Sequence, residues 1–231
     1  MGIAARSRSR WRAAVDHVLG PRAYPRRSSE ALLRTAVHEI GHALVALAYG
    51  IPVRIVSCRQ GTSNFGVTAV GSGSGEPEGV TQGGLARLRI GLAGALAEVE
   101  AGLGQGGGSE NDVAIATRVA SQLVVSHGLG EGGRIFDPSA LGGVTGPARS
   151  APAVSEWLLS QVDEDAASLV EEAAEDVRAL LAEIGGPALL ALGELLAERE
   201  TFDGYELELE ARNVLGAITS SRAPQALGEL R

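Results

Sequence analysis

Two histidines and a glutamate lie within five residues of each other, in the segment His38-Glu39-Ile40-Gly41-His42. On a helix, side chains four residues apart project from the same face, so the two imidazoles can bind one Zn²⁺ together. Glu39 can take a proton from a water molecule and pass it to a leaving amine. This spacing of two imidazoles and a carboxylate is typical of metal-assisted hydrolysis of peptide bonds.

The alternative interpretation is a pair of surface histidines on an amphipathic helix. The stretch Ala31–Tyr49 predicts a helix that follows two serines, which are candidate N-caps, and that ends just before Gly50. Both flanks of the motif are apolar, and polar groups inside a buried helix must be satisfied. A metal site would satisfy them, so the sequence favours a metal site over surface histidines.

Two histidines do not complete a catalytic zinc site, which takes three protein ligands and leaves a fourth position open. The candidates for the third ligand are His127, Cys58 and the carboxylates. A closed structural zinc site is disfavoured because such sites are rich in cysteine and this chain has one.

The motif is one of five segments that carry a recognisable pattern: Thr35–Ala46, Phe65–Thr68, Leu92–Glu98, Gly108–Thr117 and Leu196–Gly204. In order and spacing these segments resemble the FtsH-type (M41) zinc peptidases, whose motif helix usually reads His-Glu-Ala-Gly-His-Ala-Leu-Val. The resemblance covers about residues 30–210. It implies a zinc-dependent metalloendopeptidase in which Glu39 is the catalytic base.

The resemblance also implies that Asp112 is the third ligand, beside His38 and His42, and that one Zn²⁺ is bound per chain. The other interpretation of Asp112 is a capping box with Ser109 at the start of a helix. Glu98 is expected to support a ligand histidine by a hydrogen bond; its alternative role is a charge on the helix surface.

The strand that contains Gly66, Val67 and Thr68 borders the active-site cleft in the family, so these three residues are expected to bind an extended substrate by strand addition. His127 is interpreted as structural. Cys58 is interpreted as a small buried residue.

The whole sequence predicts a mainly α fold with a small β-sheet (α+β). We expect a zincin-type motif helix beside a short hairpin, followed by a helical bundle. The β-branched segments Val53–Arg59 and Phe65–Val70 predict the two strands, and a loop is expected from Gly71 to Gly84. Five further helices are expected at Leu85–Leu103, Ser109–Val125, Pro152–Ile184, Pro187–Arg199 and Tyr205–Ile218.

Charge divides the chain of 231 residues into a basic arm and an acidic body. Residues 1–34 carry eight arginines against two acids, about +6, and the remainder is about −14. We expect a flexible arm over residues 1–28, a peptidase domain over 29–218 and a tail over 219–231. The arm could contact an anionic membrane surface or nucleic acid, but a solvated tail is the favoured interpretation, and no nucleic-acid partner is expected.

Several protein classes are disfavoured by composition. The chain contains no lysine, which excludes a Walker-A phosphate loop and Schiff-base chemistry on lysine. No run of eighteen apolar residues occurs, so no transmembrane helix is expected. The FtsH-type proteins normally carry transmembrane helices and an ATPase module, and this chain is expected to lack both.

The function predicted from the sequence is hydrolysis of unfolded or flexible polypeptides by a metal-activated water, without an ATPase of its own. The alternative is a non-catalytic or regulatory relative that binds a partner protein. A separate ATPase partner and a homo-oligomer, a hexamer by family resemblance, are compatible with either. The single cysteine suits a reducing compartment, so a cytoplasmic location is expected, although the arginine- and serine-rich start also resembles an organelle transit peptide.

Overall fold

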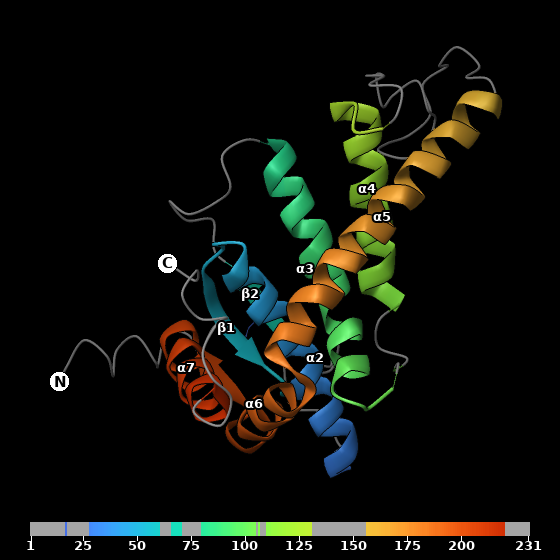
Figure 1. Cartoon of the computed structure of the whole chain (residues 1–231). Helices are drawn as coiled ribbons and strands as arrows, with labels where there is room; N and C mark the ends of the chain where they lie inside the picture. Colours follow the sequence, from blue (N-terminus) through green and yellow to red (C-terminus); the bar gives the residue numbers. More distant parts are fainter. Residues whose placement is uncertain are drawn as a thin grey trace.

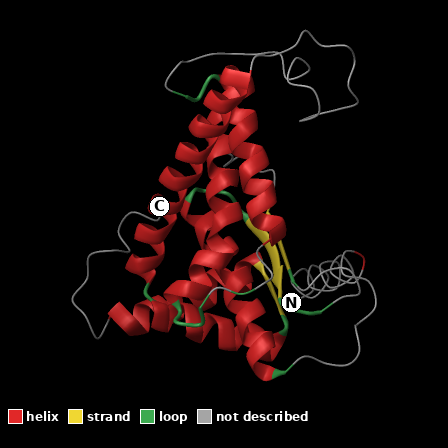
Figure 2. Cartoon of the chain, turned by 90° about the vertical axis from the view of Figure 1, so that its right-hand side faces the viewer, coloured by secondary structure: helices red, strands yellow, loops and turns green. Residues whose placement is uncertain are grey.

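The structure, a computed structural model, describes residue 17 and residues 28–60, 66–70, 80–104, 106, 110–130 and 156–219. Helices dominate, and a small sheet lies at one side of the molecule (Figures 1 and 2). The elements in chain order are α2 (Ser29–Ala48), β1 (Val53–Ser57), β2 (Val67–Val70), α3 (Val80–Glu100), α4 (Glu110–His127), α5 (Glu156–Ile184), α6 (Gly186–Arg199), β3 (Thr201–Asp203) and α7 (Gly204–Thr219). The predicted α+β fold is therefore confirmed.

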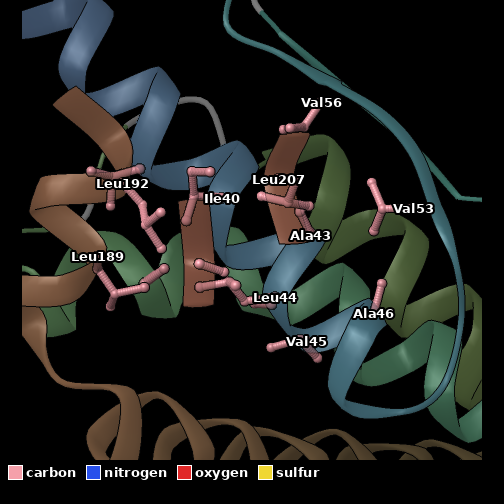
Figure 3. Close-up of a cluster of buried hydrophobic side chains, with 14 of the residues drawn as sticks. Ile40, Ala43, Leu44, Val45, Ala46, Val53, Val56, Leu189, Leu192 and Leu207 are labelled. Atoms are coloured by element: carbon pink, nitrogen blue, oxygen red, sulfur yellow. The ribbon is translucent and has the colours of Figure 1, made fainter. Parts of the chain in front are cut away.

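Helix α2 is the central element of the fold. Its N-cap is Ser28, whose hydroxyl accepts a hydrogen bond from the Ala31 amide at 3.2 Å. Residues 36–46 are all buried, so the motif lies in the interior. Apolar side chains from α2, α3, α5, α6, α7 and the sheet form the hydrophobic core around this helix, and we call this group the first core. Figure 3 shows part of it, with labelled residues from α2, β1, α6 and α7.

The three strands form an antiparallel sheet in the order β2-β1-β3. Val56 of β1 pairs with Thr68 on one side and with Phe202 on the other. Side chains alternate between the two faces of a strand, so Val56 and Phe202 enter the first core while Ile55 packs against Val67 on the opposite face. This alternation also directs Thr68 towards α2.

Helices α3, α4 and α5 form a second packing unit. Figure 1 shows α4 and α5 side by side, reaching away from the sheet. Buried side chains from these three helices form a second core: Leu88, Ala116, Ala120, Val124, Val125, Val162, Ala166 and Ala173. Helix α3 contributes to both cores and joins them.

Most predicted elements are present, with corrected bounds. Strand β1 ends at Ser57, two residues earlier than expected, and α3 begins at Val80, inside the predicted loop. Strand β3 was not predicted. Several predictions lie outside the described residues: most of the basic arm and C-terminal tail, Phe65, Ser109, and the loop residues 71–79.

By length and composition, α2 could cross a membrane. Helices α5 and α6 are long and apolar enough only when taken together, as one span bent by 82°. In the fold, however, 56% of the apolar stretch of α2 is buried inside the molecule. The polar residues of the motif lie within this buried stretch.

Candidate metal centre

Three potential ligand atoms meet between α2 and α4. The Nε2 atoms of His38 and His42 lie 3.0 Å apart, and Asp112 Oδ2 lies 2.9 Å from the first and 3.5 Å from the second. The two imidazole rings are nearly perpendicular, with an interplanar angle of 82°. Among the described residues these three form a group that could hold a metal ion. The structure thus brings together the three residues that the sequence and the resemblance predicted as ligands.

The opposite ring nitrogens hold the histidines in place. His42 Nδ1 donates to the carbonyl oxygen of Ile90 at 2.6 Å, and His38 Nδ1 lies 2.8 Å from Glu98 Oε1. Because a carbonyl and a carboxylate can only accept, both Nδ1 atoms carry hydrogens. In the neutral tautomer each Nε2 then has a free lone pair, which is the form that binds a metal. Glu98 is only 2% exposed and makes the contact with His38 that a supporting residue would need.

Helix α3 approaches the two histidines through a glycine. Gly94 of α3 faces the two histidines, and a Cβ atom at this position would lie 2.5 Å from His38 Nε2 and 2.6 Å from His42 Nε2. A side chain here would therefore occupy the point on which the lone pairs converge. Two imidazoles and one carboxylate are the donor set of a catalytic zinc site, in which a fourth position is left for water or substrate.

The charge state of the cluster follows from its hydrogen bonds. Burial lowers the pKa of His38, but the hydrogen bonds to Asp112 and Glu98, together with the negative charges of Glu39 and Asp112, outweigh it and raise the pKa to about 9. Burial raises the pKa of Asp112. Its hydrogen bonds to the two histidines nevertheless hold the pKa of this carboxyl well below its usual range. At neutral pH without metal, a proton on His38 therefore satisfies the cluster in place of a cation.

Glu39 lies next to His38 in the chain and is hydrogen-bonded by a residue of the sheet. The Thr68 hydroxyl lies 2.7 Å from Glu39 Oε2 and 3.0 Å from the Glu39 backbone oxygen. Burial raises the pKa of Glu39, while His42 and the hydrogen bond from Thr68 lower it. Gly66 approaches the same carboxylate so closely that a Cβ would overlap Oε1. Val67 faces away and packs against Ile55.

The other candidates lie apart from this cluster. Cys58 follows β1, is buried, and has its Sγ atom 3.4 Å from the Leu196 carbonyl oxygen. His127 ends α4, more than three turns after Asp112 on the same helix.

Sequence reasoning missed three contributions to the site: the steric role of Gly94, the contact between Thr68 and Glu39, and the part played by Arg34. Arg34 donates to Glu98 Oε2 at 2.8 Å. Its position four residues before His38 places both on one face of α2, and this spacing was the available signal.

Comparison with known proteins gives one consistent family. The sequence profile described as "Peptidase family M41" matches residues 26–209. ATP-dependent zinc metalloprotease FtsH 1 of Thermomicrobium roseum is 31% identical over 205 residues, which cover 84% of this chain and 31% of that protein. ATP-dependent zinc metalloprotease FtsH of Pirellula staleyi is 33% identical over 187 residues, covering 76% of this chain and 26% of that protein. The chain thus spans less than a third of the length of these relatives.

Proposed function

The chain belongs to peptidase family M41, and on that premise we propose that it is a zinc-dependent endopeptidase acting on unfolded or flexible polypeptides. One observation carries the proposal. Two imidazole nitrogens and a carboxylate oxygen converge on one point, beside a buried glutamate that a hydroxyl group holds in place.

Each residue of the site has a role in this proposal. His38, His42 and Asp112 would hold the ion. When bound, Zn²⁺ would polarise the scissile carbonyl and lower the pKa of a water molecule. Glu39 accepts the proton of the attacking water and returns it to the leaving amine. Thr68 keeps the Glu39 carboxylate oriented for both transfers.

Strand β2 is the proposed substrate platform. It lies at an edge of the three-stranded sheet and carries Thr68, which touches Glu39. An extended polypeptide paired with this edge would be bound through backbone hydrogen bonds, with little dependence on its sequence. Gly66, Val67 and Thr68 would form that contact.

Hydrolysis of a peptide bond needs no ATP, so we propose that an already unfolded polypeptide is cut without it. Folded substrates would require an unfolding ATPase. The two relatives are named as ATP-dependent proteases. For this chain, we propose that a separate ATPase and assembly into a homo-oligomer would support the cleavage of folded substrates.

The test compares the wild type with Glu39→Gln. Glutamine retains an oxygen that can accept from Thr68 but cannot take a proton, so zinc content should be unchanged while casein cleavage falls by about 10²–10⁴-fold. Glu171→Gln is the matched control, because it makes the same change at an exposed ion pair on α5. Zinc is measured by elemental analysis, and cleavage is measured without ATP, with and without a chelator.

The outcomes separate the competing functions. Cleavage by the wild type alone, abolished by the chelator, supports an ATP-independent metallopeptidase. Full activity of Glu39→Gln would refute the role of Glu39. Zinc in both proteins with cleavage in neither would refute independent activity and favour a partner-dependent or binding role, and absence of zinc from both would refute the metal site.

A further inference from the structure

Arg34 lies one helical turn before His38 on α2 and makes three hydrogen bonds. Its Nη1 donates to Glu98 Oε2 at 2.8 Å and to the Gly104 carbonyl at 2.7 Å, and its Nη2 donates to the Leu103 carbonyl at 2.6 Å. These partners lie at the end of α3 and in the segment that follows it, about 70 residues away in the chain. The Arg34 side chain therefore connects the motif helix α2 to the end of α3 and to the residues that follow it.

Glu98 is held from both sides by this arrangement. One of its oxygens faces His38 Nδ1 and the other faces Arg34. Its side chain is only 3% exposed, and a buried carboxylate is costly unless it is paired and hydrogen-bonded. Because both oxygens are engaged, the carboxylate cannot rotate away from His38 without losing the Arg34 ion pair.

Arg34 is in turn fixed by the chain that follows α3. This helix ends in a Schellman motif, in which the Gly102 amide bonds to the Val99 carbonyl and the Leu103 amide bonds to the Glu98 carbonyl. The motif turns the next two carbonyls, those of Leu103 and Gly104, towards the guanidinium group. The planar guanidinium presents several donors in a fixed fork, which suits three acceptors at once.

Gly106 also approaches the Arg34–Glu98 pair closely. A Cβ atom there would lie 2.6 Å from Glu98 Oε2 and 3.0 Å from Arg34 Cδ. Gly106 thus lies directly against the ion pair. It leads towards α4, whose first turn carries Asp112.

We propose that Arg34 is a positioning residue of the metal centre. It sets the orientation of the Glu98 carboxylate, and through it the tautomer and direction of the His38 ring. This inference rests on the proposed function, because it concerns how the proposed zinc ligand His38 is held.

The test measures zinc affinity of the purified protein by competition with a chromophoric chelator. Arg34→Met keeps the aliphatic stem and removes the charge and the donors, so the zinc dissociation constant should rise about 10-fold, as for other outer-sphere partners of metal ligands. Arg34→Lys restores the charge without the planar fork and should recover part of the loss. The matched control is Arg199→Met, which removes another interhelical ion pair of similar length, 2.9 Å to Glu210, and should change the constant less than 2-fold.

A double-mutant cycle separates positioning from a general loss of stability. If Arg34 acts through Glu98, then Arg34→Met should have little further effect once Glu98→Gln is present. In the cobalt-substituted protein, the shifted proton NMR signal of His38 Nδ1–H should broaden by faster exchange in Arg34→Met and not in Arg199→Met. Circular dichroism at the assay temperature checks that each variant is folded. If Arg34→Met is unfolded, Arg34→Lys replaces it in the comparison.

The results distinguish this inference from the function on which it rests. A wild type without zinc would overturn the metal centre itself. A wild type that binds zinc, together with a folded Arg34→Met variant of equal affinity and an unchanged Nδ1–H signal, would overturn only the role of Arg34. Full additivity of the Arg34 and Glu98 substitutions would also overturn it.

Discussion

At the scale of single residues, Thr68 is expected to set the pH at which Glu39 can act. Its hydrogen bond favours the ionised carboxylate, against the burial that raises the pKa of Glu39. Thr68→Val removes that bond, so the pKa should rise further. Ionised Glu39 is needed to accept a proton, and the acidic limb of the kcat/KM profile should therefore move up by about one pH unit.

Thr68→Ser is the control for this prediction, since it keeps the hydroxyl and should keep the wild-type profile. The measurement is peptide cleavage between pH 5 and pH 9. A valine variant with an unshifted acidic limb would show that the contact with Glu39 does not tune the base.

His38 is expected to make zinc binding dependent on pH. In the metal-free protein the pKa of His38 is about 9, so at pH 7 the ring carries a proton that must leave before Nε2 can bind a metal. Affinity should therefore increase with pH and level off above about 9. Calorimetry at pH 7 in buffers of different ionisation enthalpy should show release of about one proton from this ring per zinc ion.

Glu98→Gln tests the source of that proton. Removing the carboxylate removes one of the hydrogen bonds that raise the pKa of His38, so fewer protons should be released at pH 8 than from the wild type. Equal release by the two proteins would contradict this account of His38.

Gly94 is predicted to be the steric requirement for the ion. Gly94→Ala places a methyl group 2.5–2.6 Å from both histidine Nε2 atoms, and zinc binding should be lost. Gly91→Ala, one turn earlier on α3, meets its nearest neighbour, Ala116 Cβ, at an ordinary 3.7 Å and should bind zinc normally. Elemental analysis of both folded variants measures their zinc content. Stoichiometric zinc in Gly94→Ala would show that zinc binding does not require glycine at this position.

At the scale of elements, the approach of α2 to α3 depends on Gly41. A Cβ at this position would lie 2.5 Å from Ala97 Cβ and 2.7 Å from the Ala93 carbonyl oxygen. Gly41→Ala should therefore lower the free energy of unfolding by about 1–3 kcal/mol through overpacking. Gly216→Ala on α7 meets nothing within 4 Å and should raise it by about 0.4–1 kcal/mol. Urea denaturation measures both, and a shift of the same sign in the two variants would refute the packing argument.

The elements that sequence patterns predicted are those whose signal is local. The motif helix follows from apolar residues at helical spacing, and the β1–β2 hairpin follows from β-branched residues. Strand β3 has only three residues and exists because Phe202 pairs with Val56, which no local pattern shows. The early start of α3 was missed because Gly83 and Gly84 suggested a loop, whereas Gly84 is needed where Leu123 of α4 packs closely.

The same distinction holds within the site. The spacing of His38, Glu39 and His42 is local and was read directly. Asp112 was predicted as a ligand mainly by family resemblance. Two of the three partners of Arg34 are backbone carbonyls about 70 residues away, turned towards it by the end of α3, so these contacts depend on tertiary structure and not on residue type.

At the scale of the whole molecule, the candidate metal centre lies where the two cores meet. His38 and His42 belong to α2, at the centre of the first core, whereas Asp112 belongs to α4, which packs in the second. A cation held by all three would connect these two packing units. The ligands are not assembled in the unfolded chain, so metal binding should stabilise the fold as a whole.

Removal of zinc should therefore lower the melting temperature of the entire domain. At zinc concentrations of about 100 times Kd the bound ion contributes about 2.7 kcal/mol, which corresponds to about 5–10 °C for a domain of this size. Calorimetry with zinc and with excess chelator measures the difference. Asp112→Asn should show no zinc-dependent rise, because it removes the proposed ligand on α4. A melting temperature that is the same with and without zinc in the wild type would contradict a metal that joins the two cores.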